Sequence, residues 1–240
     1  MRIGFIGLGN VGYKLANSLV ETGHEIYVHD LKKNSANNLI KSGAIWVDSP
    51  KELALLSDIV ITCLPSPKAV AEVIEGNRGL INGMSKGKVW IEMSTTDSRE
   101  MLRLGKLMEL KGVHCCEAPV SGGCHRAATG NIAILVGGKR IAFDLALPAL
   151  ELMGYQILHV GELGKASVLK VVTNFLASTH LAALGEALMV CKKAGLDLPT
   201  VYEGIKISSG NSFVHETESQ VIMNGSYNIN FTMDLVCKDV

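Results

Sequence analysis

Residues 2–12 read RIGFIGLGNVG, a short apolar run followed by three glycines in the spacing G-x-G-x-x-G. The six loop residues are Gly7, Leu8, Gly9, Asn10, Val11 and Gly12. Between a strand and a helix, such a loop turns tightly, admits a dinucleotide pyrophosphate close to the backbone and lets helix and strand pack. The free amides at the helix start then face the phosphates. We therefore expect these six residues to bind a dinucleotide, rather than to form a simple glycine turn.

Asp30 ends the next apolar run, residues 25–30. It stands roughly 20 residues after the glycines, where an acidic side chain binds the ribose hydroxyls of the adenosine half. Its charge repels the 2′-phosphate of NADP, so NAD is the expected cofactor. Lys32 and Lys33 follow closely and keep NADP open as an alternative. The simpler role for Asp30 is to cap the following helix.

Short apolar runs alternate with amphipathic stretches over the first two-thirds of the chain. The expected strands are residues 2–6, 25–29, 45–47, 59–64, 89–92, 113–117, 132–136 and 156–160. The expected helices are residues 11–22, 35–42, 50–56, 67–74, 98–111 and 139–153. Continuous apolar strands separated by helices indicate a mostly parallel sheet covered on both faces, with right-handed crossovers. The pattern predicts a doubly wound, Rossmann-type α/β domain.

The pattern changes near residue 164. Residues 164–194 form one long apolar stretch with leucines and valines at helical intervals, and the stretch ends in Lys192, Lys193 and Gly195, which together signal a helix stop. We therefore expect a Rossmann domain over residues 1–163 and an all-helical domain over residues 164–240, entered by a long interdomain helix. That helix is apolar on nearly all sides, which predicts cover by other protein, such as a partner subunit.

Composition excludes several function classes. Lys+Arg and Asp+Glu both number 23, and this balance argues against a nucleic-acid partner. The start of the chain lacks the pattern of a signal peptide. No uninterrupted apolar run reaches the roughly 18–20 residues of a membrane span. The six cysteines show no CxxC spacing, so neither a disulfide framework nor a metal site is expected. The composition predicts a cytoplasmic protein that does not bind membranes.

Three further segments follow predicted strands or open the long helix. They are residues 93–97, residues 117–123 and residues 161–174. Ligands of open α/β sheets bind outside the carboxyl ends of the strands, so these segments are expected to converge with the glycine loop. Ser121, Gly122 and Gly123 offer a hydroxyl and uncovered amides that suit a carboxylate. An ordinary loop turn is the alternative.

Lys170 and Asn174 lie four residues apart on the predicted long helix and share one face. Lys170 stands among apolar residues. Burial lowers the pKa of a lysine toward neutrality, which suits proton exchange with an alcohol oxygen. Asn174 is then placed to hold the ammonium or a substrate hydroxyl. The alternative is a lysine that extends its ammonium to water.

Four separated motifs together resemble the β-hydroxyacid dehydrogenase family, which includes 3-hydroxyisobutyrate dehydrogenases, tartronate semialdehyde reductases and glyoxylate/succinic semialdehyde reductases. The motifs are the GLGNVG loop, the EAPVSGG segment (117–123), the start of the long helix with Lys170 and Asn174, and Phe231 with Lys238 and Asp239 near the end. The resemblance covers essentially the whole chain.

The resemblance implies an NAD(P)-dependent oxidoreductase that acts on a small 3-hydroxy acid or its semialdehyde, usually as a homodimer or homotetramer. It implies that Lys170 is the catalytic acid and base. The substrate would be held by Ser121, Gly122, Gly123 and Asn174. The nicotinamide and its ribose would be lined by Leu64, Pro65, Thr95 and Lys238. Neither the particular hydroxy acid nor the physiological direction follows from the sequence.

Two departures from the family pattern affect these expectations. Cys124, His125 and Arg126 follow the two glycines where many members carry small residues. We interpret His125 or Arg126 as reaching a second polar or anionic group on the substrate, with an exposed loop arginine as the alternative. Family members usually continue beyond residue 240, so the helical domain is expected to be incomplete.

Rival functions remain open at this point. Imine reductases share the architecture but usually lack a lysine at the position of Lys170. A 6-phosphogluconate dehydrogenase needs a much longer helical domain. A glyoxylate/succinic semialdehyde reductase is an alternative within the family, and a non-catalytic dinucleotide-binding protein is an alternative outside enzymes. A mitochondrial location stays possible if a transit peptide precedes this sequence.

Overall fold

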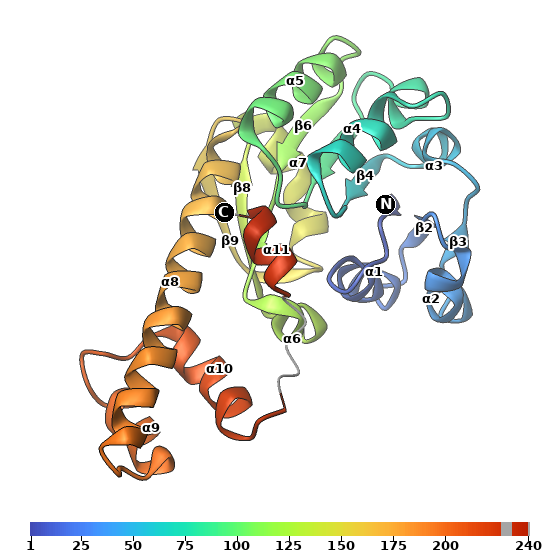
Figure 1. Ribbon diagram of the computed structural model, residues 1–240. Coiled ribbons are helices and arrows are strands. Elements are labelled where there is room, and N and C mark those ends of the chain that lie inside the picture. The colour runs from blue at the N-terminus through green and yellow to red at the C-terminus, as the bar shows by residue number, and fades with distance from the viewer. Residues whose placement is uncertain (227–231, 240) are drawn as a thin grey trace. The chain divides into compact units, whose positions relative to one another are not determined.

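The computed structural model describes residues 1–226 and 232–239 (Figure 1). The strands are β1 (Arg2–Ile6), β2 (Glu25–His29), β3 (Ile45–Trp46), β4 (Ile59–Thr62), β5 (Val89–Glu92), β6 (His114–Glu117), β7 (Val120–Ser121), β8 (Ile132–Gly137) and β9 (Gly154–Gly161). The α-helices are α1 (Gly12–Val20), α2 (Asn37–Lys41), α3 (Pro50–Leu56), α4 (Pro67–Glu75), α5 (Ser98–Glu109), α6 (Gly123–Ala128), α7 (Arg140–Leu150), α8 (Lys165–Lys193), α9 (Leu198–Lys206), α10 (Phe213–Met223) and α11 (Met233–Asp239). Two 3₁₀ turns, Lys33–Ala36 and Leu80–Asn82, complete the described elements.

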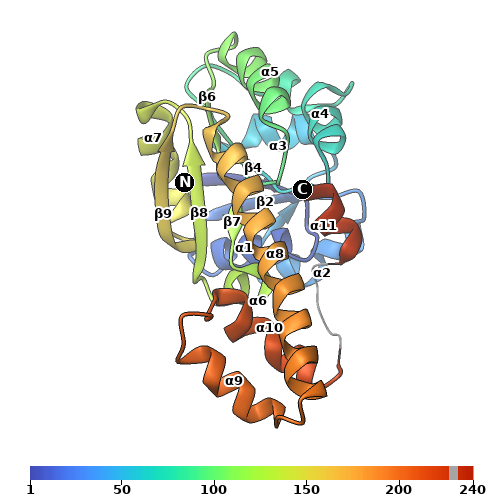
Figure 2. The same ribbon diagram turned by 60° about the vertical axis from the view of Figure 1, so that its left-hand side comes forward.

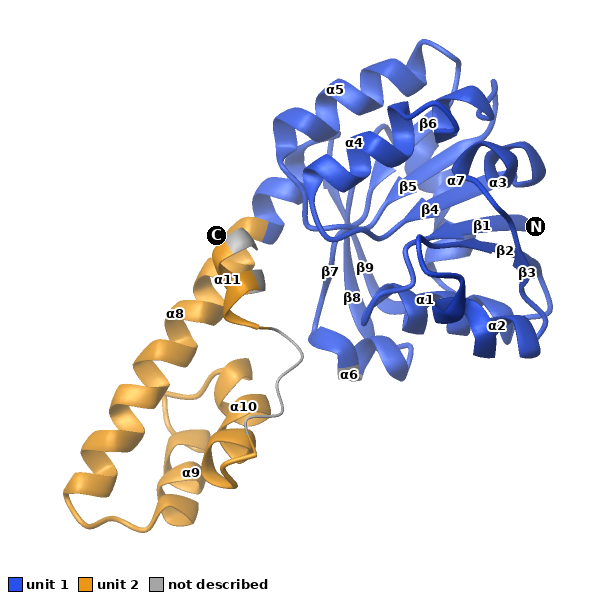
Figure 3. Ribbon diagram, turned by 45° about the vertical axis from the view of Figure 1, so that its right-hand side comes forward, with its two compact units in different colours: residues 1–170 blue, residues 171–240 orange. Residues whose placement is uncertain are grey.

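The chain forms two compact units, residues 1–170 and 171–240, which Figure 3 distinguishes by colour. The division falls within α8, whereas the sequence analysis placed a domain boundary before this helix, at residues 163/164. Residues 165–170 group with the first unit because the carboxylate of Glu117 binds the start of the helix there. Figure 2 shows α8 as one unbroken helix.

One sheet organises the first unit, with strand order β3-β2-β1-β4-β5-β6-β8-β7 and β9 paired to β8. Strands β1 to β6 pair in parallel throughout. Strand β8 runs antiparallel to β6 and β7 and parallel to β9. The prediction of a doubly wound, mostly parallel sheet followed by helices is confirmed, since the order 3-2-1-4-5-6 is that of dinucleotide-binding folds.

Two apolar clusters show that helices cover both faces of the sheet. Helices α1, α2 and α7 pack on one face, where Phe5 and Ile61 are fully buried. Helices α3, α4 and α5 pack on the other face, where Trp90 is fully buried. Successive strand residues alternate between the two clusters, as the pleat requires. The strands therefore read as continuous apolar runs because both of their faces are buried.

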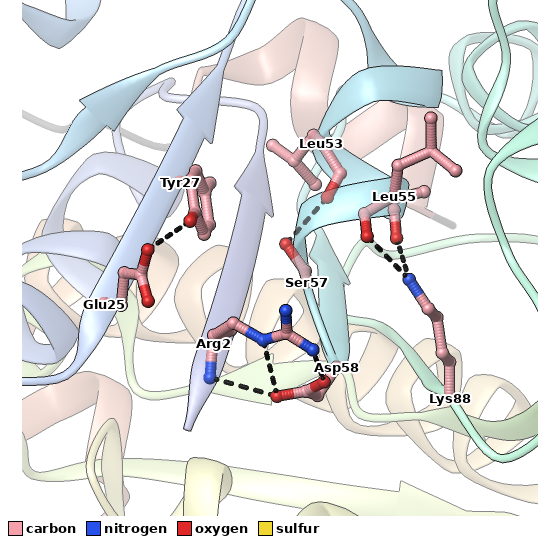
Figure 4. A network of polar contacts seen from close by, with 9 residues as sticks. Arg2, Glu25, Tyr27, Leu53, Leu55, Ser57, Asp58 and Lys88 are labelled. Atoms are coloured by element: carbon pink, nitrogen blue, oxygen red, sulfur yellow. Dashed lines mark hydrogen bonds and ion pairs between the residues drawn. The ribbon is translucent and has the colours of Figure 1, made fainter.

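The amino edge of the sheet is held by polar contacts that serve structure (Figure 4). The guanidinium of Arg2, at the start of β1, binds the carboxylate of Asp58, just before β4, at 2.5 Å. This bond lowers the pKa of Asp58. Lys88, just before β5, donates to the carbonyl oxygen of Leu55 at 3.1 Å, at the end of α3. Arg2 and Asp58 thus form an ion pair, and Lys88 binds a backbone carbonyl oxygen, so these contacts join β1 to β4 and β5 to α3.

The second unit contains most of α8 together with α9, α10 and α11. His215 of α10 is 1% exposed, and its Nε2 lies 3.0 Å from the carbonyl oxygen of Tyr202 on α9. Its Nδ1 lies 3.0 Å from the hydroxyl of Ser219. This buried histidine therefore joins α9 to α10 through both ring nitrogens.

The amino-acid sequence has no uninterrupted apolar run as long as a membrane span, but a helix that also contains polar residues can reach that length. Among the described residues one helix, α8, is long and apolar enough to do so by length and composition alone. The same composition suits a helix that other protein covers. Residues 165–170 of α8 belong to the compact first unit, and Lys170 there is 7% exposed.

Candidate active site

The glycine loop lies where β1 ends and α1 begins, and its three glycines meet different surroundings. Gly7 has a φ of 98°, and a Cβ there would lie 2.2 Å from the carbonyl oxygen of Cys63. A Cβ on Gly12 would lie 2.1 Å from the carbonyl oxygen of Gly7. A Cβ on Gly9 would meet nothing within 4 Å. The open backbone at Gly9 fits the close approach of a pyrophosphate.

Alanine at Gly9 and at Gly12 is expected to separate binding from folding. Gly9→Ala should leave the unfolding temperature unchanged but weaken dinucleotide binding roughly 10- to 200-fold, because one added methyl group in a close contact is worth about 1–3 kcal/mol. Gly12→Ala should destabilise the protein by about 1–3 kcal/mol, since its Cβ meets backbone. Calorimetric titration and thermal unfolding measure the two effects. Equal dinucleotide affinity in Gly9→Ala and the unchanged protein would remove the loop from the binding site.

Asp30 joins the end of β2 to the glycine loop. Its Oδ2 accepts a hydrogen bond from the amide of Leu8 at 2.7 Å, and its Oδ1 accepts one from the amide of Lys32 at 2.9 Å. Strands β1 and β2 are parallel neighbours, so the loop and this carboxylate lie at the same edge of the sheet. The structure thus brings Asp30 beside the loop, as the sequence analysis expected.

Aromatic rings flank this corner of the sheet. The Nζ of Lys33 lies 5.6 Å from the ring centroid of Trp46, within the range of a cation–π contact. The ring of His29 lies 5.4 Å from the same indole, and its Nδ1 is 2.8 Å from the carbonyl oxygen of Val47. The charge of Lys33 is therefore held over Trp46.

The loops after β4 and β5 are tied together by one hydroxyl. Ser94 Oγ accepts a hydrogen bond from the amide of Leu64 at 2.7 Å, and the amide of Ser94 donates to Glu92 Oε1 at 2.7 Å. The hydroxyl of Thr62 binds the other carboxylate oxygen of Glu92. Leu64, Pro65 and Thr95 thus sit on loops that a buried network fixes at the carboxyl edge.

Glu92 is fully buried at the end of β5. Burial raises the pKa of its carboxyl to about 7, although hydrogen bonds from Ser94 and Thr62 lower it. Glu117 occupies the paired position on β6, and its charge adds to the rise. The sequence alone indicated no separate role for either carboxylate. Their burial, which depends on strands far apart in sequence, is what identifies them.

Glu117 also binds the first turn of α8. Its Oε1 accepts from the amide of Ala166 at 2.8 Å, and its Oε2 accepts from the amide of Ser167 at 3.2 Å and from the hydroxyl of Ser167. Burial raises the pKa of Glu117 despite these bonds. A Cβ on Gly137, the β8 partner of Glu117, would lie 2.3 Å from Oε1. The glycine therefore makes room for this carboxylate.

Ser121, Gly122 and Gly123 follow Glu117 at the same edge. Ser121 ends β7, and both glycines have positive φ angles, 120° and 73°. No strand or helix was predicted between residues 117 and 132, whereas the structure has strand β7 and the short helix α6 there. The Nζ of Lys14 on α1 donates to the carbonyl oxygen of Cys124 at 3.0 Å. That bond ties the 121–123 segment to the helix that follows the glycine loop.

Arg126, which the sequence analysis singled out, lies against this segment. A Cβ on Gly122 would lie 2.7 Å from Arg126 Cδ. The aliphatic part of the arginine therefore packs directly on the backbone that is proposed to hold a carboxylate. The side chain of His125 lies outside the described residues.

Lys170 and Asn174 occupy successive turns of α8, as predicted. Lys170 is 7% exposed and is the last residue of the first unit. Asn174 is half-buried and belongs to the second unit. Lys170 follows Ser167 by three residues, so it lies one turn beyond the residues that bind Glu117. Lys170 is therefore buried at the start of α8 and is not an exposed surface lysine.

Thr96 carries an unpartnered hydroxyl next to the expected nicotinamide-lining residue Thr95. Its side chain is 6% exposed, and its Oγ1 is the one buried side-chain polar atom of the described residues without a hydrogen-bond partner. Buried polar atoms are normally paired, so this hydroxyl suits a ligand group. Together with Gly9 and Asp30 it makes the carboxyl edge fit a dinucleotide. Lys238 lies in α11, but its side chain is outside the described residues.

Two family models match the chain. The NAD-binding domain of 6-phosphogluconate dehydrogenase matches residues 2–161, and the NAD-binding domain of NADP-dependent 3-hydroxyisobutyrate dehydrogenase matches residues 164–240. The two matches meet close to the start of α8, near the boundary that the sequence analysis placed at residues 163/164.

Named relatives extend over the whole chain. A 2-(hydroxymethyl)glutarate dehydrogenase from Eubacterium barkeri is 35% identical over 100% of this chain and 80% of its own length. A 2-hydroxy-3-oxopropionate reductase from Escherichia coli is 31% identical over 100% of this chain and 82% of its own length. The solved structure of a Mycobacterium tuberculosis 3-hydroxyisobutyrate dehydrogenase with L-serine is 28% identical, with a TM-score of 0.90 over 100% of this chain and 84% of that chain.

Proposed function

The chain belongs to the β-hydroxyacid dehydrogenase family and is an NAD(P)-dependent hydroxyacid dehydrogenase, and we propose that it interconverts a small 3-hydroxy acid and its semialdehyde with Lys170 as acid and base. One observation carries the proposal. Lys170 is buried on the second turn of α8, whose first turn binds the carboxyl end of β6 through Glu117. The lysine is thereby held at the sheet edge that also carries the glycine loop.

Each group at this edge has a defined task in the proposal. A bound nicotinamide supplies or accepts the hydride. In the oxidative direction, neutral Lys170 Nζ accepts the hydroxyl proton as the carbonyl forms, and in the reductive direction its ammonium returns that proton to the oxygen. Ser121, Gly122 and Gly123 hold the substrate carboxylate through a hydroxyl and backbone amides. Asn174, one turn beyond Lys170, holds the substrate hydroxyl.

We propose that the remaining expected residues bind the dinucleotide. Gly7, Leu8, Gly9, Asn10, Val11 and Gly12 contact the pyrophosphate, and Asp30 binds the adenosine ribose. Leu64, Pro65, Thr95 and Lys238 line the nicotinamide and its ribose. NAD is preferred because the Asp30 carboxylate repels a 2′-phosphate, while the charge of Lys33 is held over Trp46. The hydrogen bonds that fix Asp30 support this preference.

Asp30→Asn is expected to shift the cofactor preference toward NADP. Loss of the negative charge should lower the ratio of kcat/KM with NAD to kcat/KM with NADP roughly tenfold, equivalent to about 1.4 kcal/mol. Steady-state rates with each dinucleotide measure the ratio. Asp144→Asn, which removes an exposed carboxylate on α7, is the charge control and should leave the ratio unchanged. A ratio equal in Asp30→Asn and the control would refute the preference for NAD on this basis.

The names of two relatives suggest which substrates to test, since one acts on 2-(hydroxymethyl)glutarate and the other on 2-hydroxy-3-oxopropionate. The packing of Arg126 on Gly122 favours including acids with a second anionic group. The test is therefore nicotinamide absorbance with NAD and NADP against a panel of 3-hydroxy acids, their semialdehydes, glyoxylate and dicarboxylic analogues. Turnover of a 3-hydroxy acid supports the proposal. Turnover of glyoxylate or succinic semialdehyde alone would replace it with the reductase alternative, and binding without turnover would favour a non-catalytic protein.

We further propose a homodimer or homotetramer in the cytoplasm. Large apolar side chains on α8, among them Val172, Phe175 and Leu176, are 46%, 52% and 46% exposed in the single chain, which supports cover by a partner subunit. Mass measurement in solution tests the assembly.

A further inference from the structure

The first turn of α8 has no cap of its own. The residue before the helix is Gly164, whose φ is 88° and which has no side chain to accept a hydrogen bond. The first amides of any helix lack partners within the helix and must be satisfied from outside. In this protein the partner is Glu117, which lies 49 and 50 residues away in sequence from the two amides that it binds.

The contact is built into the core. Glu117 is fully buried, and Gly137 leaves the space that the carboxylate fills. Ser167, the hydroxyl donor, is 3% exposed. A carboxylate at a helix N-terminus also interacts favourably with the helix dipole. Hydrogen bonds from the successive residues Ala166 and Ser167 to the two carboxylate oxygens fix the direction and the rotation of the helix at this point.

We propose that Glu117 is a positioning residue for Lys170. It fixes the first turn of α8 to the carboxyl end of β6, and so sets where Lys170, one turn further on, presents its Nζ. Glu117 touches neither substrate nor dinucleotide in this proposal. Proton exchange depends steeply on geometry, and a displacement of about 1 Å costs on the order of 100-fold in rate. The inference rests on the proposed role of Lys170.

Glu117→Gln tests the proposal by a split between kcat and binding. The amide keeps one acceptor oxygen but replaces the other with an NH₂ group that cannot accept from Ser167. We expect kcat to fall on the order of 10- to 100-fold, with the dinucleotide Kd and the substrate KM changed less than about threefold, which is under 1 kcal/mol. Glu109→Gln, which removes a carboxylate that pairs with Lys139 on the surface, is the control and should leave kcat unchanged.

Amide hydrogen exchange in the ligand-free protein gives a second readout. The amides of Ala166 and Ser167 should be protected in the unchanged protein, and the amide of Ser167 should lose protection in Glu117→Gln, while the core strand β5 keeps its protection. This measurement requires no substrate. If no acid on the panel is turned over, the proposed function fails, and exchange at the amide of Ser167 still decides the anchoring by Glu117.

Ser167→Ala and Gly137→Ala keep the test decisive if Glu117→Gln does not fold. Ser167→Ala removes one donor and should lower kcat to a smaller extent. Gly137→Ala keeps the charge but displaces the carboxylate, because its Cβ would meet Oε1 at 2.3 Å, and should reproduce the loss in kcat. Unchanged kcat in the folded variants, or unchanged exchange at Ser167 in Glu117→Gln, would overturn the proposal.

Discussion

Replacing Lys170 with alanine is expected to lower kcat/KM by about 10²–10⁴-fold, the range that a positioned acid or base contributes. The dinucleotide Kd should stay within about threefold, because the glycine loop and Asp30 are untouched. Steady-state rates and calorimetric titration with the same protein samples measure both quantities.

Lys165→Ala is the matched control for this experiment. Lys165 stands on the same helix, within the same compact unit, but is exposed. Lys165→Ala removes a lysine from the same helix without touching the proposed proton path, so kcat/KM should be unchanged. Equal rates in Lys170→Ala and Lys165→Ala would show that Lys170 is not the acid and base.

The second large effect concerns stability and pH. Glu92 has a pKa near 7 in the folded protein, against 4.5 for an exposed glutamate, because burial disfavours its charged form. Between these two values the unfolded chain releases the proton and the folded chain keeps it. The free energy of unfolding therefore falls as pH rises from about 4.5 to 7, by about 3 kcal/mol from this group.

Glu92→Gln is expected to remove that pH dependence. A glutamine resembles the protonated acid, since it accepts from the amide of Ser94 and donates to the hydroxyl of Thr62. Relative to the unchanged protein, the variant should gain about 3 kcal/mol at pH 8 compared with pH 5. Urea unfolding followed by the fluorescence of buried Trp90 measures this difference. The control Glu72→Gln, at an exposed position on α4, should keep the slope of the unchanged protein. Parallel pH curves for Glu92→Gln and the unchanged protein would contradict the assignment.

Local patterns in the sequence were enough to predict the nucleotide-binding half of the fold. The strand-loop-helix pattern around Gly7, Gly9 and Gly12 predicted β1 and α1, and Asp30 was expected beside the loop, where the amide of Leu8 binds it. The first of these features depends on neighbours in sequence, and the second on the fixed spacing of about 20 residues between the glycines and the acid. Strands β1, β2 and β5 match their predicted ranges residue for residue.

Contacts between segments that lie far apart in sequence could not be predicted from the sequence. Glu117 was noted only as part of a motif, because its bonds to Ala166 and Ser167 join segments that no local pattern relates. The antiparallel pairing of β8 with β6 was also not expected, since pairing direction depends on the path of the chain between strands. One signal in the sequence could have drawn attention to Glu92 and Glu117: each is an acidic residue at the last position of a predicted apolar strand.

The proposed reaction is tested most directly by following the hydrogen that is transferred. A 3-hydroxy acid that the protein accepts is deuterated at the carbon that bears the hydroxyl group and is incubated with oxidised dinucleotide. The masses of the products are then measured by mass spectrometry. Hydride transfer predicts that the deuterium appears in the reduced dinucleotide. Consumption of the acid with its deuterium released to water, or with the dinucleotide left oxidised, would contradict it.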